Sequence, residues 1–319
     1  MDKSSKKTDK PHDKRYKQLF SNKTHFLSLL KDCLKLDWTE EITEKNLKKS
    51  DNSFILQDFS EKEADVIYEV KIGNRKIIFY ILLELQRKTD NTMPYRLMLY
   101  INEIMRAYYN ESDENERDNQ DFKFPAVIPI VFYNGNDKWN VPLNLREIFD
   151  GYESFGEYVI NFSYMLIDTK RFADEDLNKF SSKLLGITLM LEKARNDIEF
   201  YEYIRENAKE IKDFNKKDRN IFNASIKIID MAYGYSRSEK IKDIFQQNQT
   251  EEAGRMLVDM IENAKKEKEE LIEKGIEKGK IEKAIETAVN FLRMGLSAEQ
   301  VSKGTKLPIE KVQELKDGL

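Results

Sequence analysis

The residues best suited to chemistry lie in a β-hairpin predicted between positions 65 and 86. Residues 65–71 and 76–86 are rich in Val, Ile, Tyr and Phe, which favour strands. Gly73-Asn74 lies between the two segments and suits a two-residue hairpin turn. The first strand carries Asp65 and the second carries Glu84, so the hairpin could bring two carboxylates together.

A two-residue turn determines which residues of the hairpin face each other. Ile72 then lies opposite Arg75, and counting back along both strands places Asp65 opposite Leu82. Side chains alternate between the two faces of a sheet, so Glu84 shares a face with Asp65. Such diagonal neighbours have Cα atoms roughly 7–8 Å apart. Two carboxylates at that separation can bind one Mg²⁺, a hard cation that prefers oxygen ligands.

A solvated hairpin edge is the alternative interpretation, because strands often end in a charged residue where they reach solvent. Against it, residues 77–83 (IIFYILL) are apolar on both faces and predict a central strand covered on both sides. Glu84 follows this run directly, and an acid at the end of a buried strand requires a partner or a metal. Gln86, one step further on the same face, could orient a water or a phosphate.

These residues resemble the Asp…(Asp/Glu)-x-Lys signature of the PD-(D/E)XK nuclease superfamily, with Gln86 where Lys usually stands. The chain is more closely similar to the Rpn family of recombination-promoting nucleases and transposase-like proteins, whose members resemble it in having Gln there. The matching segments come in the family's order: His12-Asp13-Lys14-Arg15-Tyr16-Lys17, Asp65-Val66, Glu84-Leu85-Gln86, Tyr95-Arg96-Leu97-Met98, Pro129-Ile130-Val131-Phe132-Tyr133-Asn134-Gly135 and a Glu-Lys-Gly tail. The ordered set over residues 12–135 carries the resemblance.

The resemblance implies a metal-dependent DNA endonuclease that hydrolyses phosphodiester bonds, linked to DNA recombination, mobile elements or phage defence. Asp65 and Glu84 would hold Mg²⁺, or Mn²⁺ in its place, with the backbone carbonyl of Leu85 as a further ligand. Gln86 would complete the catalytic set by positioning the water or a phosphate oxygen. Because Gln replaces Lys, the resemblance does not assign the group that handles the proton.

Two further segments are candidates for substrate binding. Asp13, at the start of a helix predicted over residues 14–36, is either an N-cap or, as the resemblance implies, lies with Lys17 near the metal or substrate. A second helix is predicted over residues 93–110, with Thr92 as its cap. Arg96 in its first turn is either a surface residue or a phosphate contact, for which its planar fork is suited.

The expected fold class is α/β, with a PD-(D/E)XK, restriction-endonuclease-like core whose mixed central sheet is flanked by helices. An all-α C-terminal region with a long helix follows. The predicted parts are a disordered tail at 1–11, the nuclease-like core at 12–170, a helical region at 171–249, and a long helix with a helical-hairpin tail at 250–319.

Further elements of the core follow from local pattern. Strands are predicted over residues 53–59, 124–133 and 158–167, and residues 42–49 favour a helix. Pro129 predicts that the strand is edge-like or bulged near that position, because proline cannot donate to a sheet ladder. Asp168 ends the last strand and would lie near the site if that strand joins the same sheet.

The long helix carries a short coiled-coil-like seam. Its apolar residues are spaced 4, 3 and 4 positions apart: Ile281, Ile285, Ala288 and Leu292. The C-terminal helices could form a homodimer by pairing with a second copy, or they could fold back over the cleft.

Composition excludes several classes of protein. One cysteine, Cys33, allows no internal disulfide, and two histidines are too few for a zinc enzyme. No apolar run is long enough to cross a membrane, so we expect a cytoplasmic protein with no membrane partner. A net charge of −4 disfavours tight non-specific binding to DNA, the expected partner, although a nuclease needs only a locally basic cleft.

A non-catalytic binding or regulatory protein is the alternative function. In that case the nuclease-like core is an inactive scaffold and the helical tail mediates oligomerisation. Gln86 in place of Lys and the acidic net charge are compatible with this alternative.

Overall fold

The computed structural model describes residues 9–50, 66–73, 75–84, 89–135, 137–233, 237–247 and 250–319. The chain forms two compact units. The first comprises Met1–Arg195 with Tyr203–Gly254, and the second comprises Asn196–Glu202 with Arg255–Leu319. The first unit contains the sheet and the candidate site. The predicted division of the core from a helical region at residue 170 stays a prediction.

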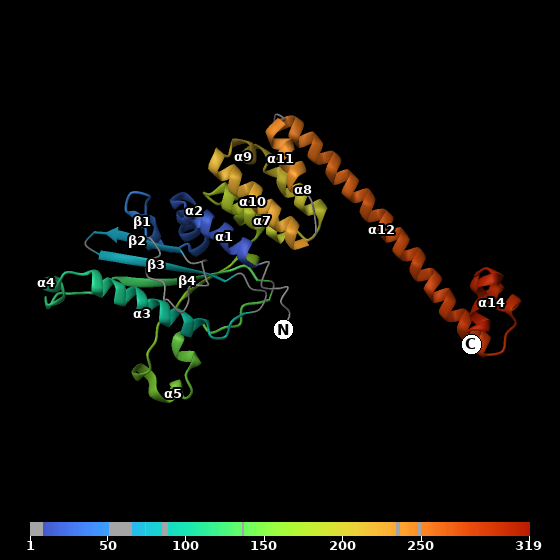
Figure 1. Ribbon diagram of the computed structural model, residues 1–319, viewed down its shortest axis with the longest axis horizontal. Helices are drawn as coiled ribbons and strands as arrows, with labels where there is room; N and C mark the ends of the chain where they lie inside the picture. The colour runs from blue at the N-terminus through green and yellow to red at the C-terminus, as the bar shows by residue number, and fades with distance from the viewer. Residues whose placement is uncertain are drawn as a thin grey trace. The chain divides into compact units, whose positions relative to one another are not determined.

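A five-stranded mixed sheet forms the centre of the first unit (Figure 1). Its strands, in spatial order, are β1 (Leu47–Lys49), β2 (Val66–Ile72), β3 (Arg75–Glu84), β4 (Ala126–Tyr133) and β5 (Met165–Asp168). The pairs β1–β2 and β2–β3 are antiparallel, whereas β3–β4 and β4–β5 are parallel. The mixed sheet expected from the sequence is therefore confirmed.

The hairpin β2–β3 has the predicted register. Ile72 pairs with Arg75, and Val66 pairs with Ile81 at the other end. Gly73 has φ +57, a left-handed conformation that glycine adopts without a steric cost. Asp65 lies outside the described residues.

One face of the sheet is covered by α3 (Met93–Glu111) (Figure 1). Helix and sheet share a buried cluster that includes Met93, Leu97, Tyr100, Ile104, Ile67, Ile78, Val131 and Tyr133. The helix runs between β3 and β4 in the chain, so it returns the chain to start β4 parallel to β3. The predicted helix over residues 93–110 is confirmed.

The opposite face is covered by α1 (Asp9–Phe20) and α2 (Lys23–Ser28) (Figure 1). Tyr16 and Phe20 pack on Phe132, with ring centroids 4.7 and 5.1 Å away. Phe26 stacks on Tyr68 with a centroid distance of 4.0 Å. Aromatic contacts thus fasten the first two helices to the strands.

The start of α1 corrects two predictions. The helix begins at Asp9, so disorder over residues 1–11 is wrong for residues 9–11. Asp13 lies inside the helix and is not its N-cap. Pro11 lies in the first turn, where its missing N–H would have had no helical partner. The helix predicted over residues 14–36 is interrupted after Phe20, and Asn22 caps α2 by accepting a hydrogen bond from the Thr24 N–H.

Two predicted elements of the core need correction. Residues 42–49, expected to be helical, contain β1. The strand expected over 158–167 is only β5, Met165–Asp168, although it does join the sheet. β4 lies between β3 and β5, but near Pro129 it is edge-like, as predicted. Pro129 is tolerated because β5 pairs only from Ile130 onward, so this part of β4 has β3 as its one neighbour among the described strands. The strand expected over 53–59 lies outside the described residues.

Short helical elements connect these parts. They are η2 (Leu29–Leu34), η3 (Asp37–Glu41), α4 (Glu114–Arg117), η5 (Leu145–Ile148), α5 (Tyr152–Phe155), η6 (Gly156–Tyr158) and η7 (Thr169–Arg171). The helices that follow are α6 (Asp174–Asn178), α7 (Lys183–Lys193), α8 (Asp197–Glu206), α9 (Ala208–Asp213), α10 (Lys216–Tyr233) and α11 (Ser238–Gln247). α10 packs against both α1 and α7.

The second unit contains most of α12 (Thr250–Arg293), with α13 (Ala298–Thr305) and α14 (Ile309–Asp317). Gly295 ends the long helix with φ +87. The predicted seam does not need a second chain, because Ala288 is packed against Val301 and Val312 of the two tail helices. Among the helices in the described ranges, none has the length and hydropathy that a membrane crossing requires.

Candidate active site

Three parallel strands end together at one edge of the sheet. In the ladder, Glu84 pairs with Tyr133, and Tyr133 pairs with Asp168. These are the last residues of β3, β4 and β5. The carboxyl ends of parallel strands are the usual position for functional residues in sheets of this kind. The candidate site is therefore this edge.

Only one position of the predicted catalytic set, Glu84, lies among the described residues. The described part of β3 ends at Glu84, within the strand predicted over residues 76–86. Asp65, Leu85 and Gln86 lie outside the described residues. Within the described ranges, no group of three or more His, Cys, Asp or Glu side chains could hold a metal ion. The metal set of Asp65, Glu84 and the Leu85 carbonyl stays a prediction.

Asp168 lies at the predicted edge because β5 joins the sheet. Its side chain is 8% exposed and pairs with Arg171 Nε at 2.9 Å. The carboxylate also accepts a hydrogen bond from the Lys170 N–H at 3.3 Å. In this arrangement Asp168 caps the turn η7 that follows the strand.

Arg96 lies in the first turn of α3 and is buried, which contradicts the interpretation as a surface residue. Its Nη1 donates to Asp90 Oδ2 at 2.7 Å. The same carboxylate accepts a hydrogen bond from Thr92, the residue expected to cap the helix. Burial acts to raise the pKa of Asp90, but the hydrogen bonds from Thr92 and Arg96 outweigh it, and the pKa is lowered. Asp90 therefore stays ionised and fixes Arg96.

A buried carboxylate that the sequence pattern did not single out connects the first helix to this edge. Glu192, near the end of α7, is 6% exposed. Its carboxylate forms an ion pair with Arg15 Nη2 and accepts from the Tyr16 hydroxyl at 2.5 Å. It also accepts from the side-chain amide of Asn134, the residue after β4. We call these four residues the Glu192 cluster.

Two residues after β5 extend the Glu192 cluster. The Thr169 hydroxyl donates to Asn134 Oδ1 at 2.6 Å, and Lys170 Nζ donates to the Glu192 backbone carbonyl at 3.0 Å. Burial raises the pKa of Tyr16 to about 12, so its hydroxyl keeps its proton and acts as a donor. Burial and Lys193 lower the pKa of Lys170, while Asp168 opposes them.

The sequence held a partial indication of the Glu192 cluster. Arg15, Tyr16 and Asn134 belong to the segments that carry the family resemblance. Glu192 follows the apolar run LLGITLML, in a helix that is buried almost throughout. An acid in such a helix requires a partner, but its identity depends on contacts with residues far away in the chain.

Comparison with known proteins identifies the family of the chain. Residues 10–221, more than half of the chain, match the family described as "Putative transposase, YhgA-like". The chain belongs to this family. The resemblance to Rpn proteins is also confirmed by curated relatives. No solved structure gives a significant match.

The relatives are distant in sequence. Recombination-promoting nuclease RpnC of Escherichia coli K12 is 26% identical over 185 residues, which are 57% of this chain and 58% of RpnC. Nuclease RpnD of Escherichia coli O157:H7 is 26% identical over 129 residues, 40% of this chain and 47% of RpnD. The chain thus spans about half the length of these two relatives. The inactive recombination-promoting nuclease-like protein RpnE of strain K12 is 20% identical over 322 residues, 94% of this chain and 95% of RpnE.

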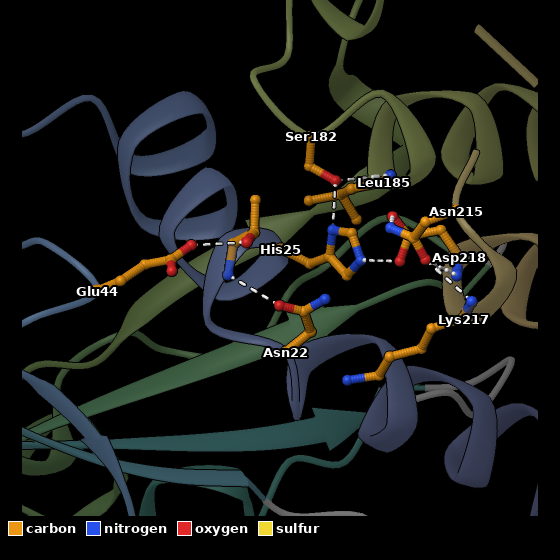
Figure 2. Close-up of polar contacts among 9 residues, drawn as sticks. Asn22, His25, Glu44, Ser182, Leu185, Asn215, Lys217 and Asp218 are labelled. Atoms are coloured by element: carbon orange, nitrogen blue, oxygen red, sulfur yellow. Dashed lines mark hydrogen bonds and ion pairs between the residues drawn. The ribbon is translucent and has the colours of Figure 1, made fainter. Parts of the chain in front are cut away.

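A second polar cluster consists of Ser182, His25 and Asp218, which are hydrogen-bonded in the same order as the Ser-His-Asp triad of serine hydrolases (Figure 2). His25 Nε2 lies 3.1 Å from Asp218 Oδ1, and His25 Nδ1 lies 2.8 Å from Ser182 Oγ. Because a carboxylate can only accept, Nε2 carries the proton and Nδ1 accepts from Ser182. Ser182 Oγ also accepts from the Leu185 N–H and caps α7.

Burial argues against catalysis by this cluster. Both Ser182 and His25 are 3% exposed, so a substrate carbonyl has no route to the hydroxyl. The three side chains come from α2, α10 and the start of α7 (Figure 2). The cluster therefore joins three helices and is structural.

Proposed function

We propose that this chain is a metal-dependent DNA endonuclease that hydrolyses phosphodiester bonds in recombination, mobile-element movement or phage defence. The observation that carries the proposal is the position of Glu84 at the end of β3, in the predicted hairpin register and beside the ends of β4 and β5. Relatives that bear the name recombination-promoting nuclease support it.

The proposed metal site is an all-oxygen set, which suits Mg²⁺ and Mn²⁺. Asp65, Glu84 and the backbone carbonyl of Leu85 would hold the ion. When bound, such a cation polarises a phosphate oxygen and lowers the pKa of water in its shell. The described residues fit this assignment in one respect, since β3 delivers position 84 to the shared edge of three strands.

The remaining proposed roles belong to the chain's own side chains. Gln86 orients the attacking water or a phosphate oxygen through its amide. Asp13 and Lys17 on α1 bind substrate, and Lys17 is half-buried. Arg96 contacts a phosphate; its ion pair with Asp90 holds the guanidinium at the start of α3.

The test is cleavage of supercoiled plasmid DNA by the full chain with Mg²⁺, with Mn²⁺ and with a chelator. Nicking that needs the metal and stops with the chelator supports the proposal. Intact plasmid under all three conditions contradicts it.

A non-catalytic role on the same scaffold is the second candidate. Two observations favour it, namely Gln86 in place of Lys and the similarity to RpnE, whose name calls it inactive, over nearly the whole chain. Metal binding separates the two functions, because a ligand that binds only the folded state raises the melting temperature. A rise with Mn²⁺ that Asp65→Asn removes supports the enzyme, and the absence of any rise supports the scaffold.

A further inference from the structure

Glu192 joins two elements that border the candidate site, α1 and the end of β4. Its carboxylate binds Arg15 and Tyr16 of α1 and the side-chain amide of Asn134. Asn134 directly follows Tyr133, which pairs with Glu84 in the ladder. The buried carboxylate of Glu192 therefore links α1 to Asn134, which follows the ladder partner of Glu84.

The contact between Asn134 and Thr169 extends this link to the next strand. The Thr169 hydroxyl donates to Asn134 Oδ1 at 2.6 Å, and Thr169 directly follows Asp168, the last residue of β5. The amide of Asn134 thus uses its nitrogen toward Glu192 and its oxygen toward Thr169. Both hydrogen bonds depend on the orientation of this one amide.

The ion pair between Arg15 and Glu192 is buried, and neighbouring side chains fix its geometry. Arg15 is 2% exposed, and its guanidinium carbon lies 4.4 Å from the centroid of the Tyr16 ring. Arg15 Nε and Nη1 are buried without a hydrogen-bond partner in the described part of the chain. A buried guanidinium in this state depends on its carboxylate, so α1 cannot shift without breaking the pair.

We propose that Glu192 is a positioning residue of the nuclease site, which orients α1 and the ends of β4 and β5 relative to Glu84. The inference rests on the proposed function and deepens it. Glu192 touches neither substrate nor metal in this role. Its charge fixes the elements that carry Lys17 and the strand ends.

A stability effect alone would not show positioning, so the test uses a double variant. Glu192→Gln alone leaves the buried guanidinium of Arg15 without a counter-charge, and this single variant is expected to unfold at lower temperature. Arg15→Met with Glu192→Met removes both charges, and buried ion pairs are often replaced by apolar residues without loss of stability. The double variant nevertheless lacks the acceptor for Tyr16 and Asn134.

Two measurements are made on the full chain: the rate of plasmid nicking, and amide hydrogen exchange of residues 130–135 and 165–171. In the double variant we expect a melting temperature above that of Glu192→Gln, nicking at least about tenfold slower than in the wild type, and faster exchange in both segments. Asp174→Asn is the matched control, because it removes the charge that pairs with Lys193, the next residue of α7, and Asp174 contacts neither α1 nor β4 in the described hydrogen bonds. The control should match the wild type in both measurements.

If the double variant matches the wild type in nicking rate, exchange protection and melting temperature, the positioning role is overturned and the ion pair is purely structural. If the wild type nicks no DNA, the proposed function fails, and hydrogen exchange alone then decides whether Glu192 orders the strand ends. Unchanged exchange in the double variant would overturn the inference in that case also.

Discussion

Arg15 of α1 and Glu192 of α7 form a buried ion pair although 177 positions separate them in the chain. Their side chains are 1% and 5% exposed. The pair therefore closes a long loop of chain around the sheet and joins its first helix to a helix beyond its last strand.

Loss of one member of this pair should be costly. Glu192→Ala leaves the Arg15 guanidinium buried without its carboxylate, and the free energy of unfolding should fall by about 3–5 kcal/mol. Urea unfolding monitored by circular dichroism measures this. The control is Lys242→Ala, which breaks a solvent-exposed pair with Glu239 and should cost under about 0.5 kcal/mol. Equal losses in the two variants would contradict a special role for the buried pair.

The aromatic contacts between α1 and β4 should dominate the stability of that face of the sheet. Phe132 is fully buried against Tyr16 and Phe20, so Phe132→Ala should lower the free energy of unfolding by about 3–5 kcal/mol. Phe155, which is 60% exposed, provides the matched control. Phe155→Ala should change the free energy of unfolding by less than about 0.5 kcal/mol. A small effect of Phe132→Ala in urea unfolding would show that α1 does not pack as described.

The His25 cluster predicts a pH dependence of stability. Burial lowers the pKa of His25, outweighing the charge and hydrogen bond of Asp218, while Lys217 adds to the lowering. The unfolded ring gains its proton near the ordinary pKa of 6.5, before the folded ring does. The contribution of neutral His25 is therefore complete above pH 6.5 and is lost as the pH falls toward the lowered folded pKa.

Two measurements test this dependence. The free energy of unfolding should fall more steeply between pH 7 and pH 5 in the wild type than in His25→Gln. The chain has two histidines, so in a His12→Gln background the titration of the remaining ring can be followed by NMR. A folded pKa at or above 6.5, or parallel pH profiles for wild type and His25→Gln, would show that burial does not lower the pKa of His25.

The two faces of α12 should respond differently to charge. Ala288 is buried beneath α13 and α14, so Ala288→Asp should unpack both tail helices. Limited proteolysis should then cut within residues 298–317. Ile276 is 54% exposed on the same helix, and Ile276→Asp should leave the tail resistant. Cleavage of the tail in both variants, or in neither, would contradict the described packing.

Local features of this fold were predictable from sequence and long-range ones were not. The register of β2–β3 follows from a two-residue turn, so counting residues is sufficient. The central position of β4 depends on β5, a strand that pairs with only four of its residues and that the sequence pattern made too long. Local pattern cannot supply the neighbour of a strand.

The same distinction applies to helices and to the site. The spacing of Ile285, Ala288 and Leu292 correctly indicates an apolar helix face, but not that α13 and α14 cover it. The resemblance identified the segments that contain Arg15 and Asn134. Their common partner, Glu192, lies outside those segments, and only the fold brings it to them.

The most direct test of the proposed nuclease site in the β2–β3 hairpin is the rate of metal-dependent plasmid nicking by Asp65→Asn and Glu84→Gln. Glu69→Gln is the control, because Glu69 lies in the same hairpin on β2, where its carboxylate pairs with Lys76 instead of lying at the predicted metal site. We predict that Asp65→Asn and Glu84→Gln each lower the nicking rate by at least about a hundredfold, while Glu69→Gln keeps the wild-type rate. Wild-type rates in both site variants would contradict the claim that the hairpin carries the active site.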